Sequence, residues 1–230
     1  MSENKLPDIL EIWAPKLQIA FDILTIDRVI EISYKVENSG VDILEAGTPL
    51  IKSVGIGAVK ELKKKFPKKI VLADLKTLDV GRIEVCMAAD AGADIVSVSA
   101  LAPNEVIVEA LAAAEEKKVL LEADLLGVED QLYRALVLKK LGVDIVCVHT
   151  AIDQEKSNIR FEDRLRVVKS IAQENLVVSA AGGLNIGNVG QMVEAGANII
   201  VVGRALTNSA EPSLVARQFK NEMMAAKEVR

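Results

Sequence analysis

Short apolar runs alternate with longer mixed stretches along almost the whole chain. Eight runs have the length and the Val, Ile and Leu content of buried strands; they cover residues 18–22, 41–45, 70–74, 94–98, 119–124, 144–148, 176–180 and 199–202. The stretches that follow them predict helices at residues 27–38, 51–65, 80–91, 104–116, 129–141, 161–173, 187–195 and 211–226. Strands that alternate with helices through short loops form a parallel sheet, so the pattern predicts an α/β protein.

A five-residue motif occurs four times and marks the junction between a helix and the next strand. In each copy a Gly ends the predicted helix, and a buried strand begins two residues later. The copies are Ser39-Gly40-Val41-Asp42-Ile43, Ala91-Gly92-Ala93-Asp94-Ile95, Leu141-Gly142-Val143-Asp144-Ile145 and Ala195-Gly196-Ala197-Asn198-Ile199. Their fourth residues are 52, 50 and 54 positions apart, which indicates an internal repeat.

Eight strand–helix units in a chain of this length predict a single-domain, closed (β/α)8 TIM barrel over residues 17–230. An open doubly wound sheet is the structural alternative, because it is built from the same units. Residues 1–16 precede the first predicted strand, and we interpret them as a short N-terminal extension that docks on the barrel.

The predicted strands are nearly free of charge until their C-terminal ends, where seven polar side chains occur. These are Asp22, Glu45, Asp74, Lys76, Asp124, His149 and Arg204. In a TIM barrel the active site is assembled at this rim from several strands. Such residues can instead serve only to bind loop amides, but seven together at one edge favour a functional site.

The third predicted strand leads into an acid, a base and a second acid, Asp74, Lys76 and Asp79. In an extended segment residues i and i+2 point the same way, so Asp74 and Lys76 should share a face. Asp79 falls where the chain turns into the next helix. Two carboxylates beside one ammonium favour its charged form, so we expect Lys76 to stay protonated. Burying such a cluster is costly, which marks it as a candidate catalytic site.

Other rim residues offer metal and proton chemistry. Glu45 and Asp74 end neighbouring strands, which lie about 4.8 Å apart, so both carboxylates could reach one Mg²⁺ ion. The alternative is a carboxylate pair that Lys76 keeps apart. His149 is the only histidine in the chain. Because it ends a predicted strand, it is a candidate for moving protons near neutral pH.

Two glycine-containing pairs, Gly182-Gly183 and Gly203-Arg204, follow the last two predicted strands. Glycines let backbone N–H groups approach an anion, and these loops are where barrels commonly bind phosphate. A Gly-Gly pair alone usually marks only a turn, so the prediction of a phosphate pocket depends on both pairs together. The polar stretch 151–160 is a candidate lid.

Composition narrows the function classes. Half of the 230 residues are apolar, and the net charge of −5 argues against nucleic acid and anionic membranes as partners. The two cysteines, Cys86 and Cys147, indicate no disulfide framework and suit a reduced, cytoplasmic location. Cys147 is interpreted as a small core side chain, and no Cys/His spacing typical of zinc sites occurs. We expect no secretory signal and no transmembrane helix.

The motif Asp74-x-Lys76-x-x-Asp79 after an apolar strand resembles the signature of the orotidine 5′-monophosphate decarboxylase suprafamily. Within it, the chain is most similar to the family of 3-hexulose-6-phosphate synthase and 3-keto-L-gulonate-6-phosphate decarboxylase, from about residue 17 to the end. The similarity is carried by residues 17–22, 45–48, 72–76, 148–150 and 181–183.

This resemblance implies a Mg²⁺-dependent reaction of a sugar phosphate through an enediolate. It implies that Glu45 and Asp74 bind Mg²⁺, that Lys76 neutralises the enediolate, and that His149 is the acid or base. The groups implied to contact the substrate are Asp22 and Asp124 for its hydroxyls, and Gly182, Gly183, Gly203 and Arg204 for its phosphate. The resemblance also implies a homodimer in which Asp79 of each subunit completes the active site of the other.

Two departures favour the synthase over the decarboxylase. The decarboxylase carries Arg three residues after the active-site His, where this chain has Ile152, and tends to have Thr at the position of Ala181. The expected reaction is the aldol addition of formaldehyde to D-ribulose 5-phosphate, or its reverse. The alternatives are decarboxylation of 3-keto-L-gulonate 6-phosphate, sugar-phosphate binding without catalysis, and another phosphate-binding barrel. Orotidine monophosphate decarboxylation is also an alternative, but it needs no metal, so Glu45 argues against it.

Overall fold

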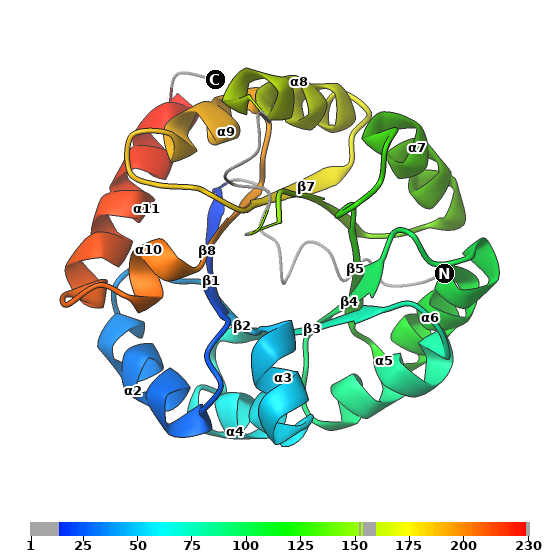
Figure 1. The fold of residues 1–230 in the computed structure, drawn as a ribbon, viewed down its shortest axis with the longest axis horizontal. Coiled ribbons are helices and arrows are strands. Elements are labelled where there is room, and N and C mark those ends of the chain that lie inside the picture. The colour runs from blue at the N-terminus through cyan, green and yellow to red at the C-terminus, as the bar shows by residue number, and fades with distance from the viewer. Residues whose placement is uncertain (1–13, 152, 154–159, 229–230) are drawn as a thin grey trace.

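Eight parallel strands close into a barrel, in chain order, within the computed structural model (Figure 1), which describes residues 14–151, 153 and 160–228. The strands are β1 Lys16–Phe21, β2 Ile43–Ala46, β3 Ile70–Thr77, β4 Ile95–Ser99, β5 Leu120–Asp124, β6 Ile145–His149, β7 Val177–Ala181 and β8 Ile199–Val202. The ring closes where β1 pairs with β8, with Gln18 beside Val201. The closed order confirms the predicted TIM barrel and excludes the open sheet.

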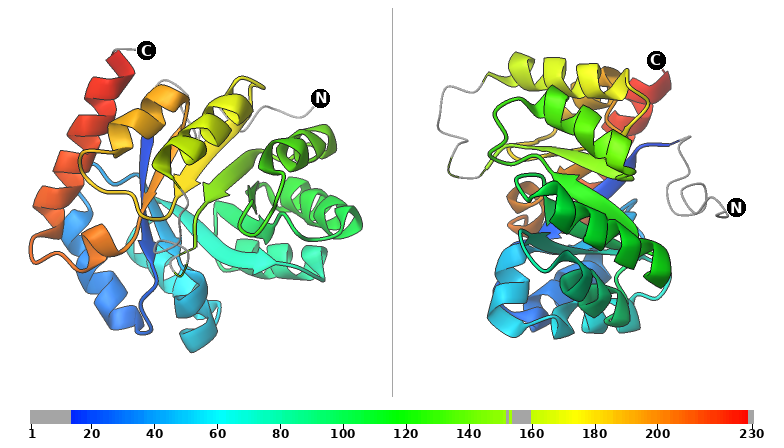
Figure 2. Two further views of the ribbon diagram at one scale, coloured as in Figure 1. Left: turned by 45° about the horizontal axis from the view of Figure 1, so that its top comes forward. Right: turned by 90° about the vertical axis from the view of Figure 1, so that its right-hand side faces the viewer.

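Helices wrap the outside of the barrel in every view (Figures 1 and 2). They are α2 Ile26–Val36, α3 Thr48–Val54, α4 Gly57–Lys65, α5 Gly81–Asp90, α6 Asn104–Lys117, α7 Gln131–Leu141, α8 Phe161–Ala172, α9 Val189–Ala195, α10 Arg204–Thr207 and α11 Pro212–Glu228. The last helix, α11, packs against both α9 and α2, so the helical layer closes as the sheet does. No helix in this described part of the chain is long and apolar enough to cross a membrane.

The barrel has two apolar cores because successive strand residues point to opposite faces. The outer core lies between the sheet and the helices and includes Phe21, Phe66 and Phe219. The inner core fills the N-terminal half of the barrel with branched side chains, among them Ile43, Ile95, Ile145 and Ile199. It closes that end of the barrel, so the open end is the C-terminal one.

The four-fold motif has two structural roles. Its glycines all have positive φ, from +88° to +116°, a conformation that favours glycine at a helix C-terminus, as predicted. Its fourth residue accepts a hydrogen bond from a backbone N–H of the preceding strand. The four bonds are Leu17 N to Asp42 Oδ2 (2.8 Å), Val71 N to Asp94 Oδ2 (2.8 Å), Leu121 N to Asp144 Oδ2 (2.9 Å) and Val178 N to Asn198 Oδ1 (3.0 Å). The repeat therefore ties the strands together in pairs.

Three elements differ from the sequence prediction. The predicted helix 51–65 is two helices, α3 and α4, because Gly55 adopts φ +78° between them. A short helix, α10, follows β8 where none was expected. Strand β3 continues to Thr77, with an irregular register after Ala73, and Lys76 has φ +49°. Lys76 therefore lies on a bulge and not on a regular extended segment.

Strand β1 begins at Lys16, one residue before the predicted start of the barrel. Residues 1–13, most of the predicted extension, lie outside the described residues. The same is true of residues 152 and 154–159, and so of most of the predicted lid.

Candidate active site

Strand alternation places the polar side chains inside the barrel. On β5 the inward positions read Leu120, Glu122 and Asp124. On β6 they continue with Cys147 and His149. The interior thus changes from apolar at the N-terminal ends of the strands to polar and charged at their C-terminal ends. This gradient produces a polar cavity on top of an apolar floor.

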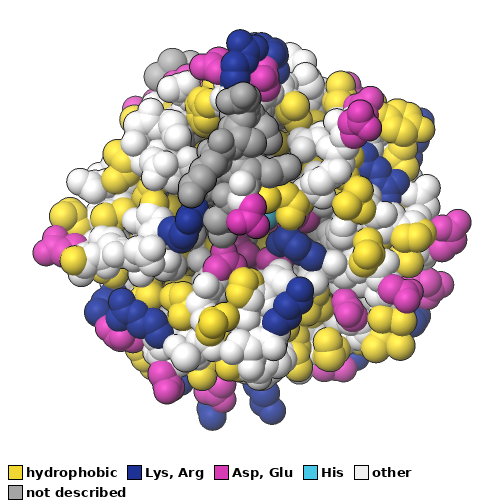
Figure 3. All heavy atoms as spheres, in the orientation of Figure 1, with side chains coloured by type: hydrophobic (Ala, Val, Ile, Leu, Met, Phe, Trp, Pro, Cys, Tyr) yellow, Lys and Arg dark blue, Asp and Glu magenta, His cyan; other side chains and the backbone are white. Residues whose placement is uncertain are grey.

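The cavity has a volume of about 600 Å³ and opens at the C-terminal ends of the strands. Acidic and basic side chains meet at the centre of this face in Figure 3. Every predicted site residue except Asp79 lines it: Asp22, Glu45, Asp74, Lys76, Asp124, His149, Gly182, Gly183, Gly203 and Arg204. The barrel thus brings together residues that are spread over 183 positions of the sequence, from 22 to 204.

The Lys76 ammonium lies between two carboxylates, as expected, but the second is not Asp79. Lys76 Nζ is 2.6 Å from Asp74 Oδ2 and 3.2 Å from Asp124 Oδ2. Burial lowers the pKa of Lys76, but the charges of Asp74, Asp124 and Glu45 raise it more, so the net pKa is above its usual range. Lys76 is therefore protonated at any physiological pH.

Asp79 lies on an exposed turn outside the cavity, where its Oδ1 accepts a hydrogen bond from Val80 N at 2.7 Å. The expectation that it flanks Lys76 of its own chain is wrong. The bulge at Lys76 turns the backbone, so the residues between Lys76 and helix α5 point away from the barrel mouth. Leu78, Val80 and Ile83 beside it are also exposed, by 57%, 48% and 65%.

Asp74 is held rigidly by two hydroxyl groups that the sequence analysis did not identify. Ser97 Oγ of β4 donates to Asp74 Oδ1 at 2.7 Å, and Thr48 Oγ1, at the start of α3, donates to Oδ2 at 2.8 Å. With Lys76, these bonds occupy both oxygens of the carboxylate and fix its orientation. Ser97 is the inward residue of its strand, so strand alternation was the available signal.

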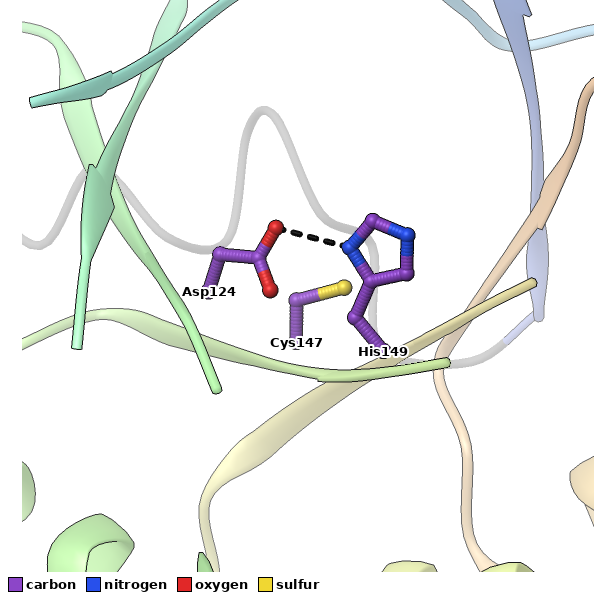
Figure 4. A group of neighbouring side chains, drawn as sticks. All are labelled: Asp124, Cys147 and His149. Atoms are coloured by element: carbon purple, nitrogen blue, oxygen red, sulfur yellow. Dashed lines mark hydrogen bonds and ion pairs between the residues drawn. The ribbon is translucent and has the colours of Figure 1, made fainter. Parts of the chain in front are cut away.

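His149 is oriented by Asp124 from the neighbouring strand (Figure 4). His149 Nδ1 lies 2.8 Å from Asp124 Oδ2. A carboxylate only accepts hydrogen bonds, so Nδ1 carries the proton and the lone pair of the neutral ring is on Nε2. Burial raises the pKa of Asp124, but the hydrogen bond and charge of His149 and the charge of Lys76 lower it more. Asp124 is therefore ionised and links Lys76 to His149.

Glu45 lies deep in the same cavity, on β2, and offers oxygen ligands to a cation. Burial and the charge of Asp74 raise the pKa of Glu45 well above its usual range. Gln18 Nε2 donates to Glu45 Oε2 at 2.7 Å, whereas the buried Gln18 Oε1 has no hydrogen-bond partner among the described residues. Two repelling carboxylates beside an unpaired amide oxygen form the hard donor set that Mg²⁺ prefers. The residues present therefore fit the expected metal.

A fourth buried acid, Glu122, joins Glu45, Asp74 and Asp124 and was not predicted from the sequence. Its Oε2 accepts a hydrogen bond from Ser179 Oγ of β7 at 2.8 Å. Burial raises the pKa of Glu122 to about 7. Glu122 lies two residues before Asp124 on the same strand, so it necessarily faces the same interior. The spacing of two residues from Asp124 could have identified Glu122. It was not noticed because Glu122 lies inside an apolar run.

The side of the cavity opposite Lys76 is built from the predicted glycine pairs. Gly182 and Gly183 have φ of +91° and +60°. A Cβ on Gly182 would lie 2.0 Å from the carbonyl oxygen of Thr150, so only glycine fits there. Gly203 and Arg204 line the same cavity after β8. This glycine wall therefore offers backbone groups and one guanidinium to a ligand, whereas the wall that contains Lys76 also carries the carboxylates.

Asp22 completes the acidic wall at the exposed C-terminal end of β1. Although Asp22 is exposed to solvent at the cavity mouth, the neighbouring cavity wall displaces part of its water, and this effect and the charge of Asp74 raise its pKa. The cavity thus holds five carboxyl groups, those of Asp22, Glu45, Asp74, Glu122 and Asp124. Such a cavity suits a polar ligand that carries hydroxyl groups at one end and an anion at the other.

Known proteins are similar to this chain over most of its length. The chain is 38% identical over 218 residues, 94% of its length, to a protein of Methanothrix thermoacetophila named "Bifunctional enzyme Fae/Hps". It spans about half (54%) of that relative. It is 35% identical to "3-hexulose-6-phosphate synthase" of Mycobacterium gastri, with 89% of this chain and 98% of that protein covered.

Two solved structures have the same fold. A "3-hexulose-6-phosphate synthase" superposes with a TM-score of 0.86 at 35% identity, over 90% of this chain and 99% of that one. A "3-keto-L-gulonate-6-phosphate decarboxylase" from Vibrio cholerae superposes with a TM-score of 0.84 at 27% identity, over 91% and 97%. The family described as "Orotidine 5'-phosphate decarboxylase / HUMPS family" matches residues 15–219. The chain belongs to this family.

Proposed function

We propose that this chain is a Mg²⁺-dependent lyase of the 3-hexulose-6-phosphate synthase type. Its reaction is the aldol addition of formaldehyde to D-ribulose 5-phosphate, or the reverse cleavage. The observation that carries the proposal is the Lys76 ammonium, fixed between Asp74 and Asp124 inside the cavity. The 35% and 33% identity to two synthases, each covered over at least 97% of its length, supports the choice of reaction.

In this reaction a proton leaves C1 of the pentulose phosphate and an enediolate forms. Lys76, which stays charged, compensates the negative charge that develops on the substrate oxygen. Asp124 holds the His149 ring so that Nε2 can take and return a proton. Glu45 and Asp74 are the residues that would hold Mg²⁺, which when bound would polarise oxygen atoms of the substrate.

The remaining cavity residues orient the substrate. Its phosphate binds at the glycine wall beside Arg204, and Asp22 and Asp124 accept hydrogen bonds from its hydroxyls. Ala181, a small buried side chain at the cavity, leaves room for a small neutral electrophile. Ile152, the other residue that favours the synthase, lies outside the described residues.

The active unit is a homodimer with shared sites. Asp79 does not reach the cavity of its own chain, and it is surrounded by exposed apolar side chains, Leu78, Val80 and Ile83. An exposed apolar patch of this kind is typical of a subunit interface. Pairing of two such patches would bury these side chains and bring Asp79 to the mouth of the other subunit.

The test is an activity panel with the purified chain. With D-ribulose 5-phosphate and Mg²⁺ it should consume formaldehyde, and a chelator should abolish the reaction. Lys76→Ala should lower kcat by at least about 10³-fold, because it removes the charge that stabilises the transition state. Decarboxylation of 3-keto-L-gulonate 6-phosphate without formaldehyde consumption would favour the decarboxylase. Sugar-phosphate binding with neither activity would favour a binding protein.

A further inference from the structure

Three potential metal ligands of different chemistry converge on one side of the cavity. Asp124, Cys147 and His149 point toward one another from β5 and β6 (Figure 4). One oxygen, the sulfur and one ring nitrogen lie within 4.8 Å of each other. Asp124 and Cys147 are buried. The His149 ring is half-buried and faces the cavity. The proposed synthase reaction assigns no task to the Cys147 sulfur.

The chemistry of this set differs from that of Glu45 and Asp74. Mg²⁺ prefers oxygen ligands, whereas a thiolate and an imidazole select softer ions such as Zn²⁺. A Zn²⁺ ion has bonds of about 2.0–2.3 Å, so tetrahedral ligand atoms lie roughly 3.5 Å apart. Atoms already within 4.8 Å therefore need side-chain shifts of only about 1 Å. The fourth position would face the open cavity and take water.

We propose that Asp124, Cys147 and His149 form a binding site for a thiophilic divalent cation, Zn²⁺, separate from the Glu45 and Asp74 carboxylates. The residues come from adjacent strands of a rigid sheet, so the three ligands are pre-arranged. When the metal binds, the proton of the Cys147 thiol is released to solvent, and the His149 ring changes tautomer, so that Nε2 carries its proton and Nδ1 can bind the ion. Occupation of this site inhibits the enzyme, because it removes Asp124 from Lys76 and the His149 ring from proton transfer.

The charge around the cluster permits this cation. Five carboxyl groups line the cavity against two basic side chains, Lys76 and Arg204. Lys76 lies 3.2 Å from the Asp124 oxygen but only 2.6 Å from Asp74, so it keeps its shorter ion pair when Asp124 turns to the metal. Glu122, two residues before Asp124 on β5, also lines this cavity and adds a carboxyl group to the surroundings of the cation.

Cobalt(II) is the probe, because a thiolate bound to Co²⁺ gives a charge-transfer absorption in the near ultraviolet that oxygen-only sites lack. Co²⁺ is titrated into the purified chain in excess Mg²⁺, which occupies Glu45 and Asp74. We expect the band to saturate at one Co²⁺ per chain and to disappear when one equivalent of Zn²⁺ is added. No band in the wild-type chain would overturn the proposal.

The variants separate this site from the Mg²⁺ site. Cys147→Ser should abolish the band and weaken Zn²⁺ binding by about 100-fold or more. The matched control is Cys86→Ser, since Cys86 lies on α5 outside the cavity and should leave the band unchanged. Glu45→Gln should also keep the band. A band that survives Cys147→Ser, or that Glu45→Gln removes, contradicts the assignment.

The absorption band measures metal binding without any enzymatic reaction, so this test does not depend on the proposed function. The predicted inhibition does depend on it. If the chain consumes formaldehyde, Zn²⁺ should inhibit the wild-type chain and the Cys86→Ser variant equally. The Cys147→Ser variant should need about 100-fold more Zn²⁺ for the same inhibition. Equal inhibition of all three would overturn the inhibitory role.

Discussion

Glu122 is a carboxyl group enclosed inside the barrel, and its ionisation makes the fold pH-dependent. Burial raises its pKa from an ordinary 4.5 to about 7. Between these values the folded chain binds a proton that the unfolded chain has lost, so stability falls as pH rises through this window. We predict that Glu122→Gln removes this fall. Relative to wild type, the variant should gain roughly 3 kcal/mol between pH 4 and pH 8.

The measurement is the free energy of unfolding by urea at several pH values. Glutamine keeps an oxygen that can accept the bond from Ser179, so the hydrogen bond is retained in the variant. Ser179→Ala is the matched control. It removes a bond that lowers the pKa of Glu122 in the folded chain, so the fall in stability should begin at the same pH but extend to higher pH. A constant difference between Glu122→Gln and wild type across this range would contradict the prediction.

Site residues that end a strand could be predicted from the sequence, whereas the residues that hold them in place could not. Asp74, Lys76 and His149 stand out because charge follows an apolar run. Thr48 and Ser97 do not, because a single uncharged hydroxyl is not distinctive, whether it starts a helix, as Thr48 does, or lies within an apolar strand, as Ser97 does. The contact between Lys76 and Asp124 joins β3 to β5, and such a distance across a barrel depends on closure of the whole sheet.

At the scale of elements, the repeated motif holds adjacent strands together at the N-terminal end of the barrel. The buried Val71 N–H donates to Asp94 Oδ2 at 2.8 Å. We predict that Asp94→Ala lowers the free energy of unfolding by about 1–3 kcal/mol, because it leaves this buried donor unpaired. Asp94→Asn should cost less than half as much. Its amide oxygen can accept the same bond, as Asn198 does from Val178.

Asp94 also pairs with Lys63, whose Nζ lies 2.6 Å away, so the ion pair needs its own control. Both side chains are about a quarter exposed, and such a pair is worth at most about 1 kcal/mol. Lys63→Met should therefore cost less than Asp94→Ala in urea unfolding. If Asp94→Asn and Asp94→Ala are equally unstable, the backbone bond is not the main contribution of this residue.

The order and type of the elements could be predicted because short apolar runs and longer mixed stretches alternate along the chain. Their exact boundaries could not. Gly55 divides the predicted helix 51–65 by adopting a positive φ, but glycine also occurs inside helices, as Gly190 does in α9. The helix α10 has only four residues, too few to show a periodic pattern. The bulge at Lys76 could not be predicted either, because an apolar run followed by charged residues does not indicate a change in strand register.

At the scale of the whole molecule, the proposed dimer makes a prediction about mixed subunits. Lys76→Ala and Asp79→Ala should each be nearly inactive alone. In an equal mixture half of the dimers are mixed, and each of these has one site with both Lys76 and Asp79. Activity should therefore recover to about a quarter of wild type. No recovery after verified subunit exchange would contradict shared sites.

A surface variant provides the independent control. Ile83 is 65% exposed in the single chain, so Ile83→Glu should fold normally. In the proposed interface the new charge would be buried, and the variant should sediment as a monomer. A dimeric Ile83→Glu protein would place the interface elsewhere on the surface.

The apolar plug formed by Ile43, Ile95, Ile145 and Ile199 has a kinetic consequence. Among the described residues the cavity is closed at the N-terminal ends of the strands, so a reactant that binds deeper in it should bind first and leave last. For two co-reactants of unequal size, this geometry predicts an ordered binding mechanism and not a random one.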